Sequence, residues 1–421
     1  AEVGTGKTLA YMVASFVAKS VYKRKYGLDL PVTITTSSIE LQKSLVKHEI
    51  PKFSEMMMRF GMISKPLKAV LRKGKEHYLC SYRYEDYLTN ILKYPDSHSI
   101  TINALETMIK SDTDIDLDKL TIPNGIKSKI CVKGSCFGCD RNLYCKYTRY
   151  ISDATKETGI DYQVTNHNMY LASQKNKVPD RKGIIKDSCF VIIDEAHKLK
   201  EAAETTFGEV LCEGDIPEYL NAIHTLCAGE SNRTEYKNLI SKAFTIQDKI
   251  FEILSQSRRL SDIDEESCTV IYINRALATN IDKLITVIQN LERLKIRANY
   301  YMPITGKSLI TKLTAIKDDC SNIIWINTDE NNELYICSVP RDITKQLKNS
   351  VWDREISHVL TSGTMSDGTD FEFFKEENGL ADIESRLILE SKTESPFNYR
   401  ENARLYAPLG LPFPDNKNEQ Y

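Results

Sequence analysis

The stretch AEVGTGKT at the start of the chain constrains the fold more than any other feature of the sequence. Its glycines let successive backbone N–H groups surround a phosphate, and the following residues, LAYMVASFVA, predict a helix. We therefore expect a phosphate-binding loop made of Gly4, Thr5, Gly6, Lys7 and Thr8. Lys7 would reach the β and γ phosphates of a nucleotide, and Thr8 would hold Mg²⁺. Such a loop normally follows a strand, so we also expect chain ahead of the first residue.

A second motif supplies the acidic groups that a nucleotide site needs. In CFVIIDEAH, residues 189–197, an apolar run ends in two carboxylates, which is typical of a buried parallel strand whose C-terminal end carries chemistry. We expect Asp194 to bind Mg²⁺ and Glu195 to polarise the attacking water, and we count His197 among the catalytic residues. The alternative is a pair of solvated carboxylates capping a helix. It is disfavoured because buried carboxylates are costly unless a cation neutralises them.

The remaining pattern indicates an α/β protein with inserted segments. PVTITTSS at 31–38 and HVLTSGT at 358–364 are further predicted strands. Residues 70–165 are rich in Lys, Tyr and Cys, whereas 200–320 are dominated by helical spacing, as in DKLITVIQNLERLKI. IIWINTDENNELYICSV predicts a hairpin with a polar turn at 329–333.

Composition limits the choice of partners and compartment. The chain has 421 residues and a net charge of −2, which excludes a globally basic nucleic-acid binder but permits local basic patches. Its 11 cysteines, without a long apolar run or a visible signal peptide, favour a reducing cytoplasm and no membrane association.

Four of the cysteines lie close together in CVKGSCFGCDRNLYC, residues 131–145. The spacing C-x4-C-x2-C-x5-C, with Cys80 upstream, suits a four-thiolate site that holds either zinc or an iron–sulfur cluster. The spacing alone does not choose the metal, and free buried cysteines are the alternative.

Basic and aromatic residues alternate in the same region, which is the pattern of a single-strand channel. Cations would follow the phosphate backbone and aromatic faces would stack on bases, whereas a solvated surface over packed tyrosines is the alternative. The residues are Arg72, Lys73, Lys75, Tyr78, Tyr82, Arg83, Tyr84, Arg141, Tyr144, Lys146, Tyr147, Arg149 and Tyr150.

Taken in order, AEVGTGKT, TTSS, DEAH and TSGT resemble motifs I, Ia, II and III of superfamily 2 helicases. The sequence is most similar to the DinG and XPD branch, whose cysteine insert opens with a stretch like KGKEHYLC at 73–80 and closes with a pattern like TNHNMYL at 165–171. SPFNYRENARLYAP at 395–408 resembles the entry to its second motor domain. The branch usually has Ser-Ala-Thr in motif III, where this chain has Ser-Gly-Thr at 362–364.

The resemblance implies a RecA-like P-loop NTPase motor. Its first domain would comprise 1–70, 160–200 and 340–385, with a cysteine-rich insert of the Fe-S type at 71–159, a helical arch insert at 201–339 and the start of a second motor domain at 386–421. A 4Fe-4S cluster would be held by Cys80, Cys139, Cys145 and one further thiol. We choose Cys136 over Cys131 for that place, because a C-x2-C pair chelates easily.

By this resemblance the chain is expected to be an ATP-dependent DNA helicase that moves 5′ to 3′ on single-stranded DNA and unwinds forked duplexes with ATP and Mg²⁺. The rival hypothesis is a DNA-binding accessory module of a larger CRISPR-associated or repair complex, with a vestigial or zinc-filled cysteine site. Asn166 and His167, in the NH pattern, are expected either to link DNA to the nucleotide site or to serve a local turn.

Overall fold

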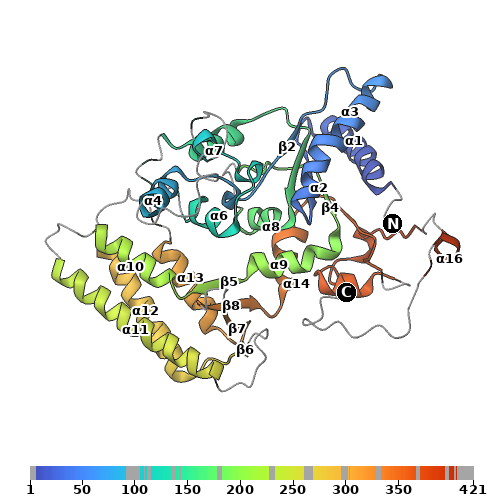
Figure 1. The fold of residues 1–421 in the computed structure, drawn as a ribbon. Coiled ribbons are helices and arrows are strands. Elements are labelled where there is room, and N and C mark those ends of the chain that lie inside the picture. The colour runs from blue at the N-terminus through green and yellow to red at the C-terminus, as the bar shows by residue number, and fades with distance from the viewer. Residues whose placement is uncertain are drawn as a thin grey trace.

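The computed structural model describes residues 6–91, 105–108, 110, 115–134, 136, 139, 141, 144–177, 183–226, 233–259, 269–294, 302, 304–328, 333–366, 370–393, 398–402 and 404, and every structural statement refers to these. Gly4, Thr5 and most of the predicted entry to a second motor domain lie outside them. Figure 1 shows a parallel sheet with its helices, a segment rich in cysteine beside it, and a long helical insert with a small sheet of its own.

The central sheet has five strands in the order β2-β3-β1-β4-β9, and every neighbouring pair is parallel. The strands are β1 (Val32–Thr36), β2 (Ala69–Leu71), β3 (Tyr162–Asn166), β4 (Phe190–Asp194) and β9 (His358–Thr361). The three strands expected from the sequence are present, and the α/β prediction with a parallel sheet is confirmed. Because all neighbouring strands are parallel, all five carboxyl ends lie at one edge of the sheet.

Helices cover both faces of this sheet because successive strand residues alternate sides. On one face, Ile34 and Ile192 pack with α1 (Lys7–Tyr26) and α3 (Ile50–Arg59). On the other, Val191 and Ile193 pack with α8 (His167–Lys175), α9 (Leu199–Phe207) and α14 (Ile343–Leu347). The shorter helices are α2 (Ile39–Ser44), η1 (Leu45–Glu49), η5 (Ala196–Lys198), η6 (Lys348–Trp352), α15 (Glu372–Glu377), η7 (Ser385–Leu387) and α16 (Tyr399–Asn402).

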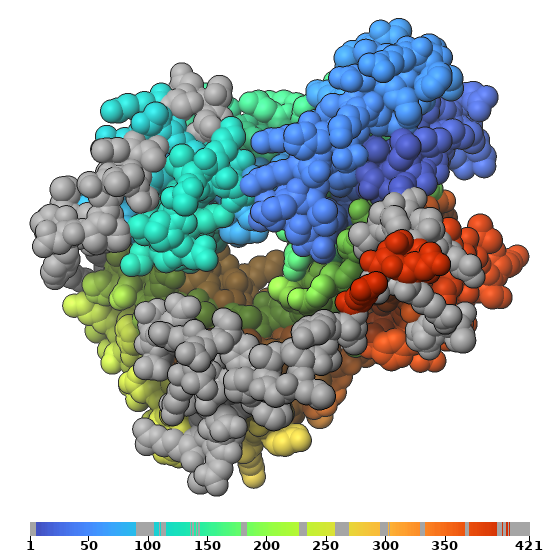
Figure 2. Space-filling view, turned by 45° about the vertical axis from the view of Figure 1, so that its right-hand side comes forward, coloured from blue at the N-terminus to red at the C-terminus, as the bar shows by residue number. Residues whose placement is uncertain are grey.

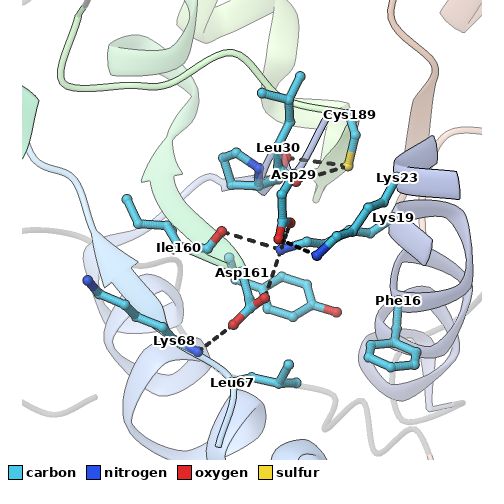
Figure 3. Close-up of polar contacts among 12 residues, drawn as sticks. Phe16, Lys19, Lys23, Asp29, Leu30, Leu67, Lys68, Ile160, Asp161 and Cys189 are labelled. Atoms are coloured by element: carbon cyan, nitrogen blue, oxygen red, sulfur yellow. Dashed lines mark hydrogen bonds and ion pairs between the residues drawn. The ribbon is translucent and has the colours of Figure 1, made fainter. Parts of the chain in front are cut away.

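A polar cluster fastens α1 to the end of the sheet opposite the nucleotide motifs (Figure 3). Lys19 Nζ lies 2.7 Å from Asp161 Oδ1 and 3.4 Å from Asp29 Oδ1. The second oxygen of Asp161 accepts a hydrogen bond from the backbone N–H of Lys68 at 2.9 Å. Because these groups lie just before β1, β2 and β3, the cluster ties one helix to the starts of three strands.

The cysteine-rich segment lies between β2 and β3. Its helices are η2 (Lys75–His77), α4 (Ser81–Ile91), η3 (Leu117–Lys119), α6 (Asn124–Ile130) and α7 (Lys146–Lys156). Lys73 is buried and pairs with Asp116 at 2.7 Å and Asp118 at 2.8 Å. Burial alone would raise the pKa of Asp118, but hydrogen bonds from Lys127, Lys73 and His77 outweigh it and hold that pKa well below its usual range. This ion cluster stabilises the segment from inside.

The second insert combines helices with an antiparallel sheet in the order β5-β8-β7-β6. The strands are β5 (Glu209–Cys212), β6 (Thr269–Val270), β7 (Asn322–Thr328) and β8 (Leu334–Pro340), and the helices are α10 (Asp215–Leu226), α11 (Arg233–Arg259), α12 (Arg275–Leu294) and α13 (Gly306–Lys317). The helical prediction and the β7–β8 hairpin are confirmed, although most of the predicted turn lies outside the described residues. Strands β5 and β6 were not predicted.

Strands β5 and β8 form the neck of this insert. They pair antiparallel from Glu209 with Ser338 to Cys212 with Tyr335, so the insert leaves and re-enters the domain of the central sheet through adjacent strands. Gly208 stands at its base, where a Cβ atom would come within 2.7 Å of the Glu204 carbonyl oxygen.

Within the described residues, no helix has both the length and the apolar character needed to cross a membrane.

Candidate nucleotide-binding site

The nucleotide motifs meet at the carboxyl edge of the central sheet. Gly6 adopts a left-handed conformation, with φ of 80°, directly before α1, which glycine allows without steric cost. Lys7 follows it, and its Nζ atom lies 3.6 Å from Glu195 Oε1. That ammonium group is buried and makes no hydrogen bond to any described residue. A buried cation without a hydrogen bond is costly, so this position favours an incoming anion.

Glu195 is held in a strained backbone conformation. Its φ of 54° and ψ of 47° are left-handed, and it is the one non-glycine residue with positive φ in the described part of the chain. This conformation costs roughly 1–2 kcal/mol for a residue with a side chain, and such outliers concentrate at functional sites. The turn directs the carboxylate of Glu195 towards Lys7 and towards His197 Nδ1, at 3.3 Å.

Asp194 is the most buried carboxylate of the group. Burial raises its pKa, and the neighbouring charge of Glu195 raises it further, while Lys7 opposes both effects. Tyr11, one turn into α1, donates a hydrogen bond from its hydroxyl to Asp194 Oδ2 at 3.3 Å. The Thr8 hydroxyl also interacts with Tyr11. The structure thus brings Lys7, Thr8 and both carboxylates together, and it adds Tyr11, which sequence reasoning missed.

His197 connects the acidic motif to the end of β9. Its Nδ1 atom lies 2.7 Å from the hydroxyl of Ser362, and that hydroxyl in turn accepts from the backbone N–H of Thr364 at 3.2 Å. The predicted motifs II and III are therefore joined by direct hydrogen bonds. The contact runs through Ser362 and Thr364, so the glycine at 363 leaves it intact.

A pocket of about 700 Å³ opens beside these groups. Its lining includes the polar residues Lys7 and Ser362 and the apolar residues Phe190, Val359 and Leu360. Charged phosphates suit the polar residues, because desolvating them against apolar side chains is costly.

The NH pattern contributes two residues with different roles. Asn166 caps α8, where its side-chain oxygen accepts from the backbone N–H of Met169 at 2.8 Å. His167 is buried, and its Nδ1 atom lies 2.9 Å from the hydroxyl of Thr35 at the end of β1. Asn166 therefore has the local turn role that the sequence suggested, whereas His167 contacts the end of β1.

The candidate cluster thiols lie near one another. Burial raises the pKa of Cys136 to about 11, and charges on Cys145, Cys80 and Cys139 raise it in decreasing order. All four are free thiols. The sulfur of Cys131 donates a hydrogen bond to the carbonyl oxygen of Ser128 at 3.7 Å.

The four cysteines are the type of ligand that a zinc ion or an iron–sulfur cluster needs, and they lie near one another. Among the described residues, however, no three His, Cys, Asp or Glu side chains have the mutual spacing of a metal site. The thiols would have to move closer to share a cluster or a zinc ion, so the cluster remains a prediction.

Comparison with known proteins identifies several that are similar to this chain. No family model matches the sequence. The 3′-5′ exonuclease DinG of Bacillus subtilis is 23% identical over 466 residues, which cover 96% of this chain and 47% of the relative. The ATP-dependent DNA helicases YoaA of Haemophilus influenzae and DinG of Photobacterium profundum are 23% and 22% identical, covering 98% and 97% of this chain and 62% and 64% of theirs. The chain is thus similar, over nearly its whole length, to proteins named DinG and YoaA.

The chain spans about half to two thirds of the length of these relatives. The solved structure of S. tokodaii Xpd4 covers 86% of the chain at 12% identity, with a TM-score of 0.35.

The basic and aromatic residues of the DinG-like chain divide into buried and accessible groups. Lys73, Tyr78 and Tyr84 are buried, so they pack the insert and do not form a surface for DNA. Tyr144 is 85% exposed, and Arg141 lies over the ring of Tyr82 at 5.2 Å. The accessible part of the predicted patch is therefore smaller than the sequence indicated.

Figure 2 shows an opening between the domain built on the central sheet, the cysteine-rich segment and the second insert. Glu218 of α10 is close enough to Arg83 and Lys133 of the cysteine-rich segment for their charges to act on it. Burial raises the pKa of Glu218, and these two cations oppose the shift.

Proposed function

We propose that this chain is the ATP-hydrolysing, DNA-gripping part of a DinG-type helicase with a RecA-like motor. The observation that carries the proposal is the arrangement of Lys7, Asp194 and Glu195 at one edge of a parallel sheet. The ammonium of Lys7, which is buried and makes no hydrogen bond to a described residue, supports a phosphate-binding role, and the relatives over nearly the whole chain support a helicase.

In the proposed reaction, Lys7 leaves Glu195 for the β and γ phosphates of ATP. Thr8 and Asp194 would hold Mg²⁺, which neutralises charge developing on the phosphates. Glu195, released from Lys7, orients the attacking water and accepts its proton. His197 senses this change directly because it contacts both Glu195 and Ser362. The conformation at the end of β9 would then depend on which nucleotide is bound.

The DNA strand would pass through the opening in Figure 2, with accessible residues such as Arg141 and Tyr144 on the cysteine-rich side. A 4Fe-4S cluster on Cys80, Cys136, Cys139 and Cys145 would fix that side as a rigid wall. The resemblance supports 5′ to 3′ movement and unwinding of forked duplexes.

The test is ATP hydrolysis in the presence and absence of single-stranded DNA, with Lys7→Ala as the disabling variant. We expect hydrolysis to be lost with little change in thermal stability, because the substitution removes a phosphate-binding charge and no core volume. Lys25→Ala, at the exposed far end of the same helix, is the matched control and should behave as wild type. DNA-stimulated hydrolysis that survives Lys7→Ala would show that the site lies elsewhere.

A further inference from the structure

A second cavity, which we call the β2–α7 pocket, lies between the residues that flank β2 and helix α7. Its volume is about 700 Å³, and it shares no lining residue with the pocket beside the nucleotide motifs. Five of its lining residues are cations and two are carboxylates, so positive charge exceeds negative charge by three. The cations are Lys68, Arg72, Lys146, Arg149 and Lys156. A hollow with this surplus of positive charge favours an anion.

Arg72 is the buried cation of the β2–α7 pocket. It is 3% exposed, and its backbone N–H donates to the carbonyl oxygen of Val164 in β3 at 2.8 Å, which fixes its backbone on the sheet. Its Nη2 atom donates to Glu157 Oε2 at 2.7 Å. Its Nε atom is also buried but makes no hydrogen bond to a described residue. Because a guanidinium keeps its charge in proteins, this buried donor favours a ligand that can accept from it.

The carboxylate of Glu157 is already shared between two cations. Its Oε1 atom lies 2.9 Å from Lys68 Nζ, and its Oε2 atom accepts from Arg72. Burial would raise the pKa of Glu157, but hydrogen bonds from Lys68 and Arg72 hold that pKa below its usual value. Glu157 therefore stays ionised and holds both cations beside the pocket, while the Nε donor of Arg72 is left for a ligand.

Helix α7 adds cations from the opposite wall. Lys146, Arg149 and Lys156 are separated by three and by seven residues, which places them on one face of the helix. The first turn of α7 contains no acidic residue, so the positive end of the helix dipole adds to the charge of Lys146. Arg149 is exposed and can approach a ligand in the pocket. An anion bound there would meet positive charge from the sheet and from the helix.

A phosphate group suits these donors better than a carboxylate does. The N–H groups of a guanidinium form a planar fork that matches two oxygens of either anion. A phosphate has further oxygens and, when it is free or terminal, a second charge, so it can accept from Arg72 and from α7 at once. The volume of about 700 Å³ is in the range of small-molecule sites, so the phosphate can belong to a larger molecule.

We propose that the β2–α7 pocket binds a phosphate group, with Arg72 as the buried donor and Arg149 as the exposed contact. The phosphate comes either from a nucleic-acid backbone, in which case the inference rests on the proposed function, or from free phosphate. Neither Arg141 nor Tyr144 lines the pocket, so a strand bound there would make a contact additional to the proposed ones.

Inorganic phosphate is the first probe, in calorimetric titrations of Lys7→Ala protein, so that the nucleotide site does not contribute. Sodium chloride of equal ionic strength is the reference that removes screening effects. In this background Arg72→Lys keeps the charge and loses the Nε donor, so phosphate should bind about tenfold more weakly. Arg149→Ala should weaken binding about fivefold. Arg59→Ala, an exposed arginine of α3 outside the pocket, is the matched control and should leave phosphate affinity unchanged.

Two results would overturn the site. One is a phosphate affinity in Arg72→Lys and Arg149→Ala that equals the affinity in Arg59→Ala. The other is acetate that binds as tightly as phosphate, since the pocket would then select charge and not a phosphate group. If thermal unfolding shows that Arg72→Lys does not fold, Arg149→Ala decides the question, because its side chain is exposed.

A short single-stranded oligothymidylate then separates the two sources of phosphate. If a nucleic-acid backbone is the ligand, Arg149→Ala should lower oligonucleotide affinity about fivefold and reduce the salt slope by about one, and Arg59→Ala should do neither. If free phosphate is the ligand, Arg149→Ala changes phosphate binding alone. Protein that binds phosphate through Arg72 but binds no oligonucleotide would overturn the DNA-gripping part of the proposed function and would support this site.

Discussion

Replacing Glu195 by glutamine should strengthen ATP binding and slow ATP hydrolysis. The carboxylate lies 3.6 Å from Lys7 Nζ, and the two side chains are 26% and 10% exposed. At an effective dielectric constant of about 20, this attraction is roughly 4–5 kcal/mol, but solvent screening and desolvation leave a net of about 1 kcal/mol for such a partly exposed pair. ATP must displace Glu195 from Lys7, so the wild-type protein loses about that much on binding.

The Glu195→Gln variant no longer has this competition. Its affinity for ATP should rise about fivefold, because 1.4 kcal/mol corresponds to a factor of ten. Its turnover should fall by about 10²–10⁴, because an amide can orient water but cannot accept the proton. Glutamine also keeps the strain of the left-handed turn unchanged, so the fold is expected to remain stable.

The assay is a titration with a fluorescent ATP analogue, followed by steady-state phosphate release on the same preparations. Glu201→Gln is the matched control, because that side chain is 69% exposed and pairs only with Lys198 at 3.0 Å among the described contacts. It should change neither quantity. Hydrolysis within threefold of wild type in Glu195→Gln, or a tenfold loss of ATP affinity, would refute the competition between Glu195 and the phosphates.

Three further predictions concern the inserts. Cys136→Ser should lower the iron content of anaerobically purified protein well below that of Cys131→Ser, and the reverse order would overturn the ligand choice. Asp118→Asn should destabilise the protein by about 3 kcal/mol in urea unfolding, because it removes a buried partner of Lys73. The depressed pKa means that this stability is present above about pH 4 and is lost as the pH falls further, and a flat acid profile would contradict it. Gly208→Ala should cost about 1–3 kcal/mol, because the added Cβ would come within 2.7 Å of the Glu204 carbonyl oxygen and 3.1 Å of the Ser338 carbonyl oxygen in β8, and wild-type unfolding would exclude that clash.

The nucleotide motifs could be predicted from the sequence because each is local. Lys7 follows its glycines directly, and Asp194 and Glu195 end a continuous apolar run, so short-range chemistry identifies them. Tyr11 could not be assigned in the same way. Its hydroxyl meets Asp194 across 183 positions of sequence, and nothing in a helix of ordinary composition marks one tyrosine for that contact.

In the cysteine-rich region, contacts between distant residues made a prediction from the sequence wrong. A lysine beside tyrosines has the pattern of a nucleic-acid surface, yet Lys73 is buried because Asp116 and Asp118, more than 40 positions away, fold over it. Strands β2 and β3 were also missed as members of the central sheet. Strand β2 has only three residues, and the parallel pairing of both strands depends on partners that are distant in sequence.

The neck formed by β5 and β8 has a consequence for how a chain of this kind can change in evolution. Strand pairing holds the two ends of the insert side by side. For folding of the parent domain, the whole insert is therefore equivalent to a short loop. Loop-closure entropy rises only slowly with length, by about 0.6 kcal/mol for each doubling. Helices can therefore be added, lost or exchanged beyond Cys212 and before Leu334 with little effect on folding of the parent domain. The neck is a natural point for recombination, and a short turn joining its two strands should yield a motor that still folds.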